Sequence, residues 1–309
     1  MYSSLATPST ARQLHDRIYA GEIIRFTDLQ PMTTLVDFTR TFLEDALHPW
    51  PPQQIHRHLS HSEQTVLFAK CQNDFAGSTE IQRRWQDIVE SLGIAADTLA
   101  CDRLHLRFQP HREPDQFTPR ARTTATIAFH RDTWGSNIYA QTNWWAPIYP
   151  ITAGRTFALY PGLWRRPLLN SSADFDMRAI LQRSHCHGRN AVDADEAIPH
   201  LLEAIDPREG IAVDIAPGSL IAFSGAHAHA GVGNSTGLTR ISFETRSVLI
   251  ADLIAGLGAP NVDGHAPWKT VGLFRRMSDG RRLNEVLDCG FIEPYPGASG
   301  ASTFLKNRT

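Results

Sequence analysis

The spacing of apolar residues changes once along the chain, from the period of a helix to the alternation of a strand, and this change constrains the fold most. Up to about residue 100, apolar residues recur every three or four positions, as on the buried face of an amphipathic helix. The clearest stripe consists of Ile81, Trp85, Ile88, Val89 and Leu92. Thr79 and Gln82 form a capping-box pattern at its start, and Gly93 predicts its end.

From about Leu104 the apolar period is two, which is typical of strands with one buried face. The alternating segments are 104–108, 127–129, 139–145, 211–215 and 238–248. Gly and Pro turns separate them, and no helix of the length that joins parallel strands lies between them. We therefore expect an α+β protein with a mainly β core, either an antiparallel barrel or a double-sheet jelly roll, behind a helical N-terminal region.

The predicted organisation is a single domain over residues 1–309. Residues 1–100 form the helical front, residues 101–250 the β core, and residues 251–309 a C-terminal tail without an assigned structure. Within the core, residues 163–209 lack a clear period and are predicted to be an insertion. Long insertions are usually functional or mobile, so a lid over a binding site is one hypothesis for this segment.

The charge of the chain favours small-molecule partners. With 30 Lys and Arg against 32 Asp and Glu, the net charge is -2, which argues against nucleic acid and against a polybasic membrane surface. The apolar stretch 248–259 is broken by Asp252 and is too short for a membrane span. No signal-peptide pattern is visible in residues 1–12, and the 4 cysteines lie far apart, so we expect a cytoplasmic protein of open oligomeric state.

Two segments carry residues that could bind a metal: TIAFHRDTW at 126–134 and GAHAHAG at 225–231. On an extended strand, His130 and Asp132 leave the same face and can bind one ion. A histidine from the second segment would complete a two-histidine, one-carboxylate set, which leaves positions open on non-haem Fe(II). Arg240 follows on the next strand and could hold a carboxylate through two hydrogen bonds. Taken alone, an HxD pattern also fits a strand-end histidine beside a solvated Asp; the conjunction favours a metal site.

Over roughly residues 104–248 the chain resembles the Fe(II)/2-oxoglutarate-dependent oxygenases, specifically the phytanoyl-CoA dioxygenase-like branch. The motif of that branch, HxD and later H…N…R, is matched by His130, Asp132, His229, Asn234 and Arg240. The resemblance implies a double-stranded β-helix (cupin-like jelly roll), iron on His130, Asp132 and His229, and 2-oxoglutarate on the iron with its far carboxylate on Arg240. O2 is then the second cosubstrate. The family often has PGSH where this chain has YPGLW at 160–164.

His227 competes with His229 for the third ligand position. We favour His229, because Asn234 and Arg240 then lie five and eleven residues later, as in the family. His227 is then a supporting or packing residue.

Strand alternation supplies further candidates on the strand at 139–145. Tyr139, Gln141, Asn143 and Trp145 share a face, and amides mixed with aromatics suit a ligand-filled interior. Gln141 and Asn143 are candidates to bind 2-oxoglutarate or substrate, and Tyr139 and Trp145 are candidates for substrate. The alternative is that this face is solvated and Trp144 points inward.

On the arginine strand, Arg240, Ser242, Glu244 and Arg246 share a face. If Arg240 points into the barrel, we expect Ser242 to approach the same carboxylate. Arg246 has two interpretations, a contact for an acidic group of the substrate or an ion pair with Glu244.

The function that follows is an Fe(II)- and 2-oxoglutarate-dependent oxygenase that hydroxylates or desaturates a small polar metabolite, in a biosynthetic pathway. Halogenating relatives have a small residue where this chain has Asp132, so the resemblance is to hydroxylating or desaturating enzymes. The alternative is a non-oxidative, cupin-like metal-binding protein, an isomerase or a ligand sensor. The cluster His185, Cys186 and His187 fits a loop better than a zinc site, because no matching ligand pair occurs elsewhere.

Overall fold

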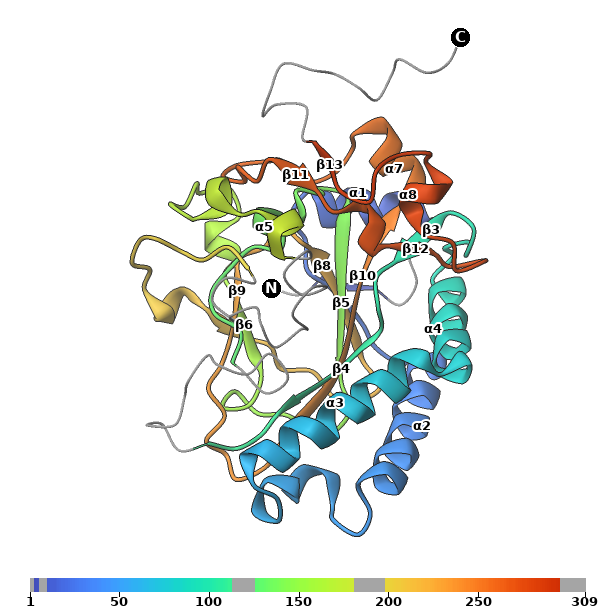
Figure 1. The fold of residues 1–309 in the computed structure, drawn as a ribbon, viewed down its shortest axis with the longest axis vertical. Helices are drawn as coiled ribbons and strands as arrows, with labels where there is room; N and C mark the ends of the chain where they lie inside the picture. Colours follow the sequence, from blue (N-terminus) through green and yellow to red (C-terminus); the bar gives the residue numbers. More distant parts are fainter. Residues whose placement is uncertain (1–2, 6–9, 113–125, 181–197, 295–309) are drawn as a thin grey trace.

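The computed structural model describes residues 3–5, 10–112, 126–180 and 198–294, and it combines a helical layer with mainly antiparallel sheets (Figure 1). The helices are α1 (Ala11–Tyr19), α2 (Gln30–Leu47), α3 (His61–Gly77), α4 (Thr79–Ser91), α5 (Thr133–Ser136), α7 (Ile250–Ala255) and α8 (Leu283–Val286). The 3-10 turns are η1 (Pro52–Arg57), η3 (Pro161–Leu163), η4 (Ser172–Asp174), η6 (Pro207–Glu209) and η7 (Val271–Leu273). The strands are β1 (Ser3–Leu5), β2 (Ile24–Phe26), β3 (Leu99–Cys101), β4 (His105–Gln109), β5 (Gln141–Pro147), β6 (Phe157–Leu159), β7 (Ile211–Ala212), β8 (Leu220–Ser224), β9 (His229–Gly231), β10 (Arg240–Leu249), β11 (Trp268–Lys269), β12 (Arg275–Arg276) and β13 (Glu293–Pro294).

The larger sheet has 8 strands in the order β1-β2-β8-β5-β10-β3-β12, and β4 also pairs with β10. Every pair in it is antiparallel except β1 with β2. The smaller sheet has the order β7-β6-β9, and β11 pairs with β13 in the C-terminal segment. The predicted combination of helices with a mainly antiparallel β region is therefore confirmed, although β1 and β2 of the large sheet lie within the predicted helical front.

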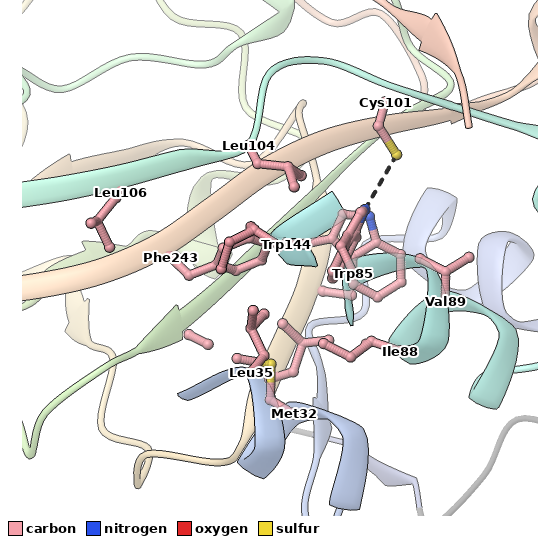
Figure 2. Packing of buried hydrophobic residues seen from close by; sticks show 14 of the residues in the cluster. Met32, Leu35, Trp85, Ile88, Val89, Cys101, Leu104, Leu106, Trp144 and Phe243 are labelled. Atoms are coloured by element: carbon pink, nitrogen blue, oxygen red, sulfur yellow. Dashed lines mark hydrogen bonds between the residues drawn. The ribbon is translucent and has the colours of Figure 1, made fainter. Parts of the chain in front are cut away.

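The two faces of the larger sheet have different partners. Trp144 on β5 and Phe243 on β10 point toward the helices, where Trp85 of α4 packs against both, with ring centroids 5.6 and 5.2 Å apart (Figure 2). Because side chains alternate along a strand, Trp145 points the other way and packs on Phe157 of β6, at 5.0 Å. The opposite face of the large sheet thus meets the small sheet, and the candidate site lies between them.

Side chains cap the starts of α3 and α4, and the cap of α4 differs from the sequence prediction. The N-cap of α4 is Ser78, whose hydroxyl accepts a hydrogen bond from the Ile81 N–H at 3.3 Å, so the capping box predicted from Thr79 is wrong. A reciprocal capping box occurs at the start of α3 instead, between Ser60 and Glu63. No helix within the described ranges has the length and apolar character to cross a membrane.

The segment predicted as a strand at 127–129 is not a regular strand. Its pairing consists of one bridge between His130 and His229, with both backbone N–O distances at 3.0 Å, and a bond from the Gly231 N–H to the Ile127 carbonyl at 2.8 Å. The C-terminal segment, left unassigned from the sequence, contributes β12 to the edge of the large sheet beside β3.

Candidate metal centre

Three residues predicted as metal ligands lie together between the two sheets. One potential ligand atom from each of His130, Asp132 and His229 lies within 4.8 Å of the other two, and no other group of this kind occurs in the part of the chain that the structure describes. His130 Nε2 is 3.6 Å from Asp132 Oδ1, and the two imidazole centroids are 4.3 Å apart. Two imidazole nitrogens and one carboxylate oxygen suit a divalent transition metal and leave coordination positions open.

Each histidine ring is held by a hydrogen bond to the backbone carbonyl two residues earlier. His130 Nδ1–H donates to the Ala128 carbonyl at 2.8 Å, and His229 Nδ1–H donates to the His227 carbonyl at 3.0 Å. A carbonyl can only accept, so Nδ1 carries the proton in each ring and Nε2 keeps its lone pair. Such a bond to the second ring nitrogen is the usual way in which proteins orient a metal-binding histidine.

Asp132 reaches the site by a route that differs from the sequence prediction. Its backbone is helical, with φ -61° and ψ -32°, and it is the N-cap of α5. The Ser136 N–H donates to the Asp132 carbonyl at 2.9 Å. The expectation that one extended strand carries His130 and Asp132 on the same face is therefore wrong in its local geometry. The chain turns directly after the bridge, and this turn brings the carboxylate beside the imidazole.

Gln141 and Asn143 support Asp132 from the neighbouring strand. Asn143 Nδ2 donates to Asp132 Oδ2, and Gln141 Nε2 donates to Asn143 Oδ1 at 2.9 Å. Both amides lie on the face of β5 opposite to Trp144, and both are buried, so the alternative of a solvated amide face does not hold. With Oδ2 engaged by an amide, Oδ1 is the carboxylate oxygen that faces His130.

The charges of Asp132 and His229 suit metal binding at neutral pH. Burial opposes ionisation of Asp132, but the charge of Arg246 outweighs burial and holds the pKa of the carboxyl well below its usual range. Burial, assisted by the neighbouring His130, lowers the pKa of His229 to about 4. A carboxylate and a neutral imidazole are the protonation states that bind a metal.

Arg240 and Ser242 present unpaired polar atoms within the same interior face of β10. Arg240 is buried, and neither Nε nor Nη1 has a hydrogen-bond partner among the described residues. The Ser242 hydroxyl, fully buried, also lacks a described partner. Burial lowers the pKa of Arg240 to about 10, so the group stays charged at neutral pH. Glu244, the next residue on this face after Ser242, forms an ion pair with Arg107 at 2.6 Å.

The remaining predicted residues have different surroundings, and not all of them lie beside the triad. Arg246 forms an ion pair with Asp102, Nε to Oδ2 at 3.5 Å, and lines a small cavity together with His130, Asp132 and Gln141. Trp145 belongs to an apolar cluster with Phe157 and Phe223, whose rings contact His229 with centroids 6.2 and 5.7 Å away. Tyr139 is directed toward Gly264 of the C-terminal segment and does not line that cavity.

His227 and Asn234 have structural surroundings. His227 stacks on Trp164, with ring centroids 4.3 Å apart, and its Nε2 lies 3.1 Å from the Gly21 carbonyl. Asn234 Nδ2 donates to the carbonyls of Gln109 and Leu238, both at 2.7 Å, and so shapes the turn before β10. The cluster at 185–187 lies outside the described residues.

Arg131, which the sequence analysis did not select, lies between two of the predicted ligands and is almost fully buried. Its guanidinium donates to the carbonyls of Ala226 and Leu163, at 2.5 and 2.6 Å, and to that of Arg166 at 3.0 Å. Its Nε pairs with Asp263 Oδ2 at 3.1 Å. The available sequence signal was an arginine placed between two predicted metal ligands, because an arginine next to a buried site is itself buried only when it is paired.

Comparisons with known proteins give structural neighbours only. No protein-family model matches the sequence, and no curated protein matches it. The structure is similar to EvdO2 from Micromonospora carbonacea var. aurantiaca complexed with 2-oxoglutarate, with 14% identity over 76% of this chain and 89% of that chain and a TM-score of 0.43. It is similar to EctD from S. alaskensis with 2-oxoglutarate and 5-hydroxyectoine, with 14% identity over 84% of this chain and 88% of that chain and a TM-score of 0.44. The non-heme monooxygenase ThoJ matches with 15% identity over 77% of both chains and a TM-score of 0.41. Similarity at this level does not transfer a function, which has to follow from this chain's own residues.

Proposed function

We propose that this chain is an Fe(II)- and 2-oxoglutarate-dependent oxygenase of the phytanoyl-CoA dioxygenase-like type, which hydroxylates or desaturates a small polar metabolite in a biosynthetic pathway. Residues 1–309 act as one domain, with a double-stranded β-helix in residues 101–250. One observation carries the proposal: a two-histidine, one-carboxylate set shares its interior with a buried arginine, whose Nε and Nη1 have no hydrogen-bond partner among the described residues.

The donor set of the triad fits Fe(II). Imidazole and carboxylate ligands in a group of three, with positions left open, are typical of non-haem Fe(II) oxygenases. The Nδ1–H bonds of His130 and His229 hold both rings ready for the metal, and the amide of Asn143 holds Asp132.

Arg240 and Ser242 fit the far carboxylate of 2-oxoglutarate. A guanidinium binds a carboxylate through two parallel hydrogen bonds, and the unpaired Nε and Nη1 of Arg240 supply two donors. The Ser242 hydroxyl adds a third. When bound, the metal and 2-oxoglutarate supply the oxidising chemistry that acts with O2 on an unactivated C–H bond.

The protein's own part is to orient the reactants and to exclude water. Trp145, Phe157 and Phe223 form an apolar wall beside His229. An apolar wall strengthens the electrostatic contacts within the site and prevents side reactions with water. Halogenating enzymes have a small residue at the position of Asp132. The carboxylate at this position therefore favours hydroxylation or desaturation.

Succinate release from 2-oxoglutarate tests the proposal. Wild-type protein with Fe(II) in air should form succinate, and Arg240→Ala should form little. Arg208→Ala is the matched control, because this arginine is 90% exposed and pairs only with the nearby Asp206 among the described residues. Anaerobic addition of Fe(II) and 2-oxoglutarate should give a weak visible charge-transfer band. A folded, metal-loaded protein that shows neither signal supports a non-oxidative metal-binding function instead.

A further inference from the structure

A cavity of about 80 Å³ opens beside His130 and Asp132, on a side of the triad that does not involve Arg240. Its polar walls include Asp102, Arg246 and Thr270, and its apolar walls include Phe175 and Phe274. Neither Arg240 nor Ser242 lines it. Arg240 and Arg246 are six residues apart on β10, or about 20 Å at roughly 3.3 Å per residue. The cavity and the pair formed by Arg240 and Ser242 therefore lie on separate sides of the candidate metal ligands.

Arg246 and Asp102 form a loose pair of opposite charges on the cavity wall. Their Nε–Oδ2 distance is 3.5 Å, and the other neighbour of this oxygen, His105 Nε2, is 3.7 Å away. Asp102 Oδ1 is better bonded, accepting from Thr245 Oγ1 at 3.0 Å and from the Arg246 N–H at 2.9 Å. Asp102 is thus held in place by the hydrogen bonds to Oδ1. Its Oδ2 and the Arg246 guanidinium share only a long ion pair, so each can form a stronger contact with a bound molecule.

The charges around the cavity balance before a substrate arrives. Arg246 offsets Asp102, and Arg131 is neutralised by Asp263 at 3.1 Å. A divalent metal would be neutralised by Asp132 and one carboxylate of 2-oxoglutarate, and the second carboxylate would be neutralised by Arg240. A substrate with a net charge would leave that charge uncompensated in a partly buried site, which is unfavourable. A molecule that carries one positive and one negative charge has no net charge, and it can bind both Arg246 and Asp102.

The rest of the wall suits a small molecule with an apolar part. Thr270 is 1% exposed, lines the cavity and has a hydroxyl without a described hydrogen-bond partner. Its N–H donates to the Ser136 carbonyl at 3.1 Å, which fixes it beside α5. Phe175 and Phe274 provide the apolar surface, and both are largely buried.

We propose that the substrate is a zwitterion of the amino acid type. Its carboxylate binds Arg246, its ammonium group binds Asp102 Oδ2, and its carbon chain lies against Phe175 and Phe274 beside the metal ligands. The reaction at that carbon chain rests on the proposed function, but the recognition of two opposite charges does not.

Binding of matched analogues tests the recognition in the wild-type protein. The probes are L-leucine, L-methionine and L-phenylalanine, each with its N-acetyl form, which keeps only the anion, and its amide, which keeps only the cation. Binding is measured by calorimetry and by melting temperature, with Fe(II) and 2-oxoglutarate under anaerobic conditions. At least one amino acid should bind, and both of its singly charged analogues should bind at least about tenfold more weakly, because each lacks one charge-assisted contact. Equal binding of either analogue, or no binding of any amino acid, overturns the proposal.

Two variants assign the charges to residues. Arg246→Gln should remove the preference for the amino acid over its amide, and Asp102→Asn should remove the preference over the N-acetyl form. Arg208→Gln should keep both preferences. If either site variant fails to fold, the analogue series on the wild-type protein still decides. Selective zwitterion binding without succinate formation would refute the proposed oxygenase function alone, whereas succinate formation without this selectivity would refute only the substrate class.

Discussion

Replacing Arg240 by methionine should make the metal-free protein more stable. The guanidinium is buried, its Nε and Nη1 have no hydrogen-bond partner in the described part of the chain, and burial lowers its pKa from 12.5 to about 10. A shift of this size corresponds to about 3 kcal/mol of unfavourable free energy, at roughly 1.4 kcal/mol per pKa unit. Methionine keeps much of the side-chain volume and removes the buried charge. We therefore expect the free energy of unfolding to rise by about 1–3 kcal/mol.

The same substitution should remove the binding of 2-oxoglutarate. Loss of charge-assisted, two-point contacts costs about 3 kcal/mol or more, so affinity should fall at least about 100-fold. Urea unfolding of the metal-free proteins measures the stability, and anaerobic calorimetry of the metal-loaded proteins measures the affinity. Arg240→Lys is the matched control, which keeps the charge and loses the two-point geometry. A metal-free Arg240→Met protein that unfolds at lower urea, or one that binds 2-oxoglutarate unchanged, would refute the reasoning.

Three further predictions concern the support of the site and the core. Asn143→Leu removes the donor to Asp132 and should weaken metal binding about 10- to 100-fold in a metal titration, whereas an unchanged affinity would show that the amide does not position the ligand. Burial lowers the pKa of His227 from 6.5 to about 4, so its contribution to stability is complete above the unfolded pKa and is lost as the pH falls toward 4. His227→Gln should therefore reduce the loss of stability between about pH 7 and pH 5 by about 2 kcal/mol in urea unfolding, and an unchanged pH dependence would contradict this. Trp85→Ala leaves a cavity against Trp144 and Phe243 and should cost about 3–5 kcal/mol of unfolding free energy, whereas a cost near zero would mean that the core collapses into the space.

Local patterns in the sequence predicted the helical front, the antiparallel strands and the residues of the triad. They did not predict how the chain turns at Asp132, because α5 has 4 residues and is too short to show a helical period. The neighbouring Trp144 and Trp145 left two possible orientations of β5. Only the packing of Trp144 against the helices, which depends on α4, resolves them.

The ion pairs of the interior could not be predicted from local pattern either. Arg107 and Glu244 are 137 positions apart, and their pairing depends on the register between β4 and β10. The pairing of Asp102 with Arg246 likewise depends on how strands far apart in the sequence pair with each other. Thr270 and Phe274 belong to the tail that showed no period, and only the fold places them at the cavity.

Arg131 links the candidate metal ligands to the segment at 163–166. It is bonded covalently to His130 and Asp132, and its guanidinium is tied to the carbonyls of Leu163 and Arg166. We expect a molecule that shifts this segment to change the spacing of His130 and Asp132 through the backbone of Arg131, without touching the metal. Such coupling is reciprocal, so whatever factor a bound molecule adds to metal affinity, the metal adds to the affinity for that molecule.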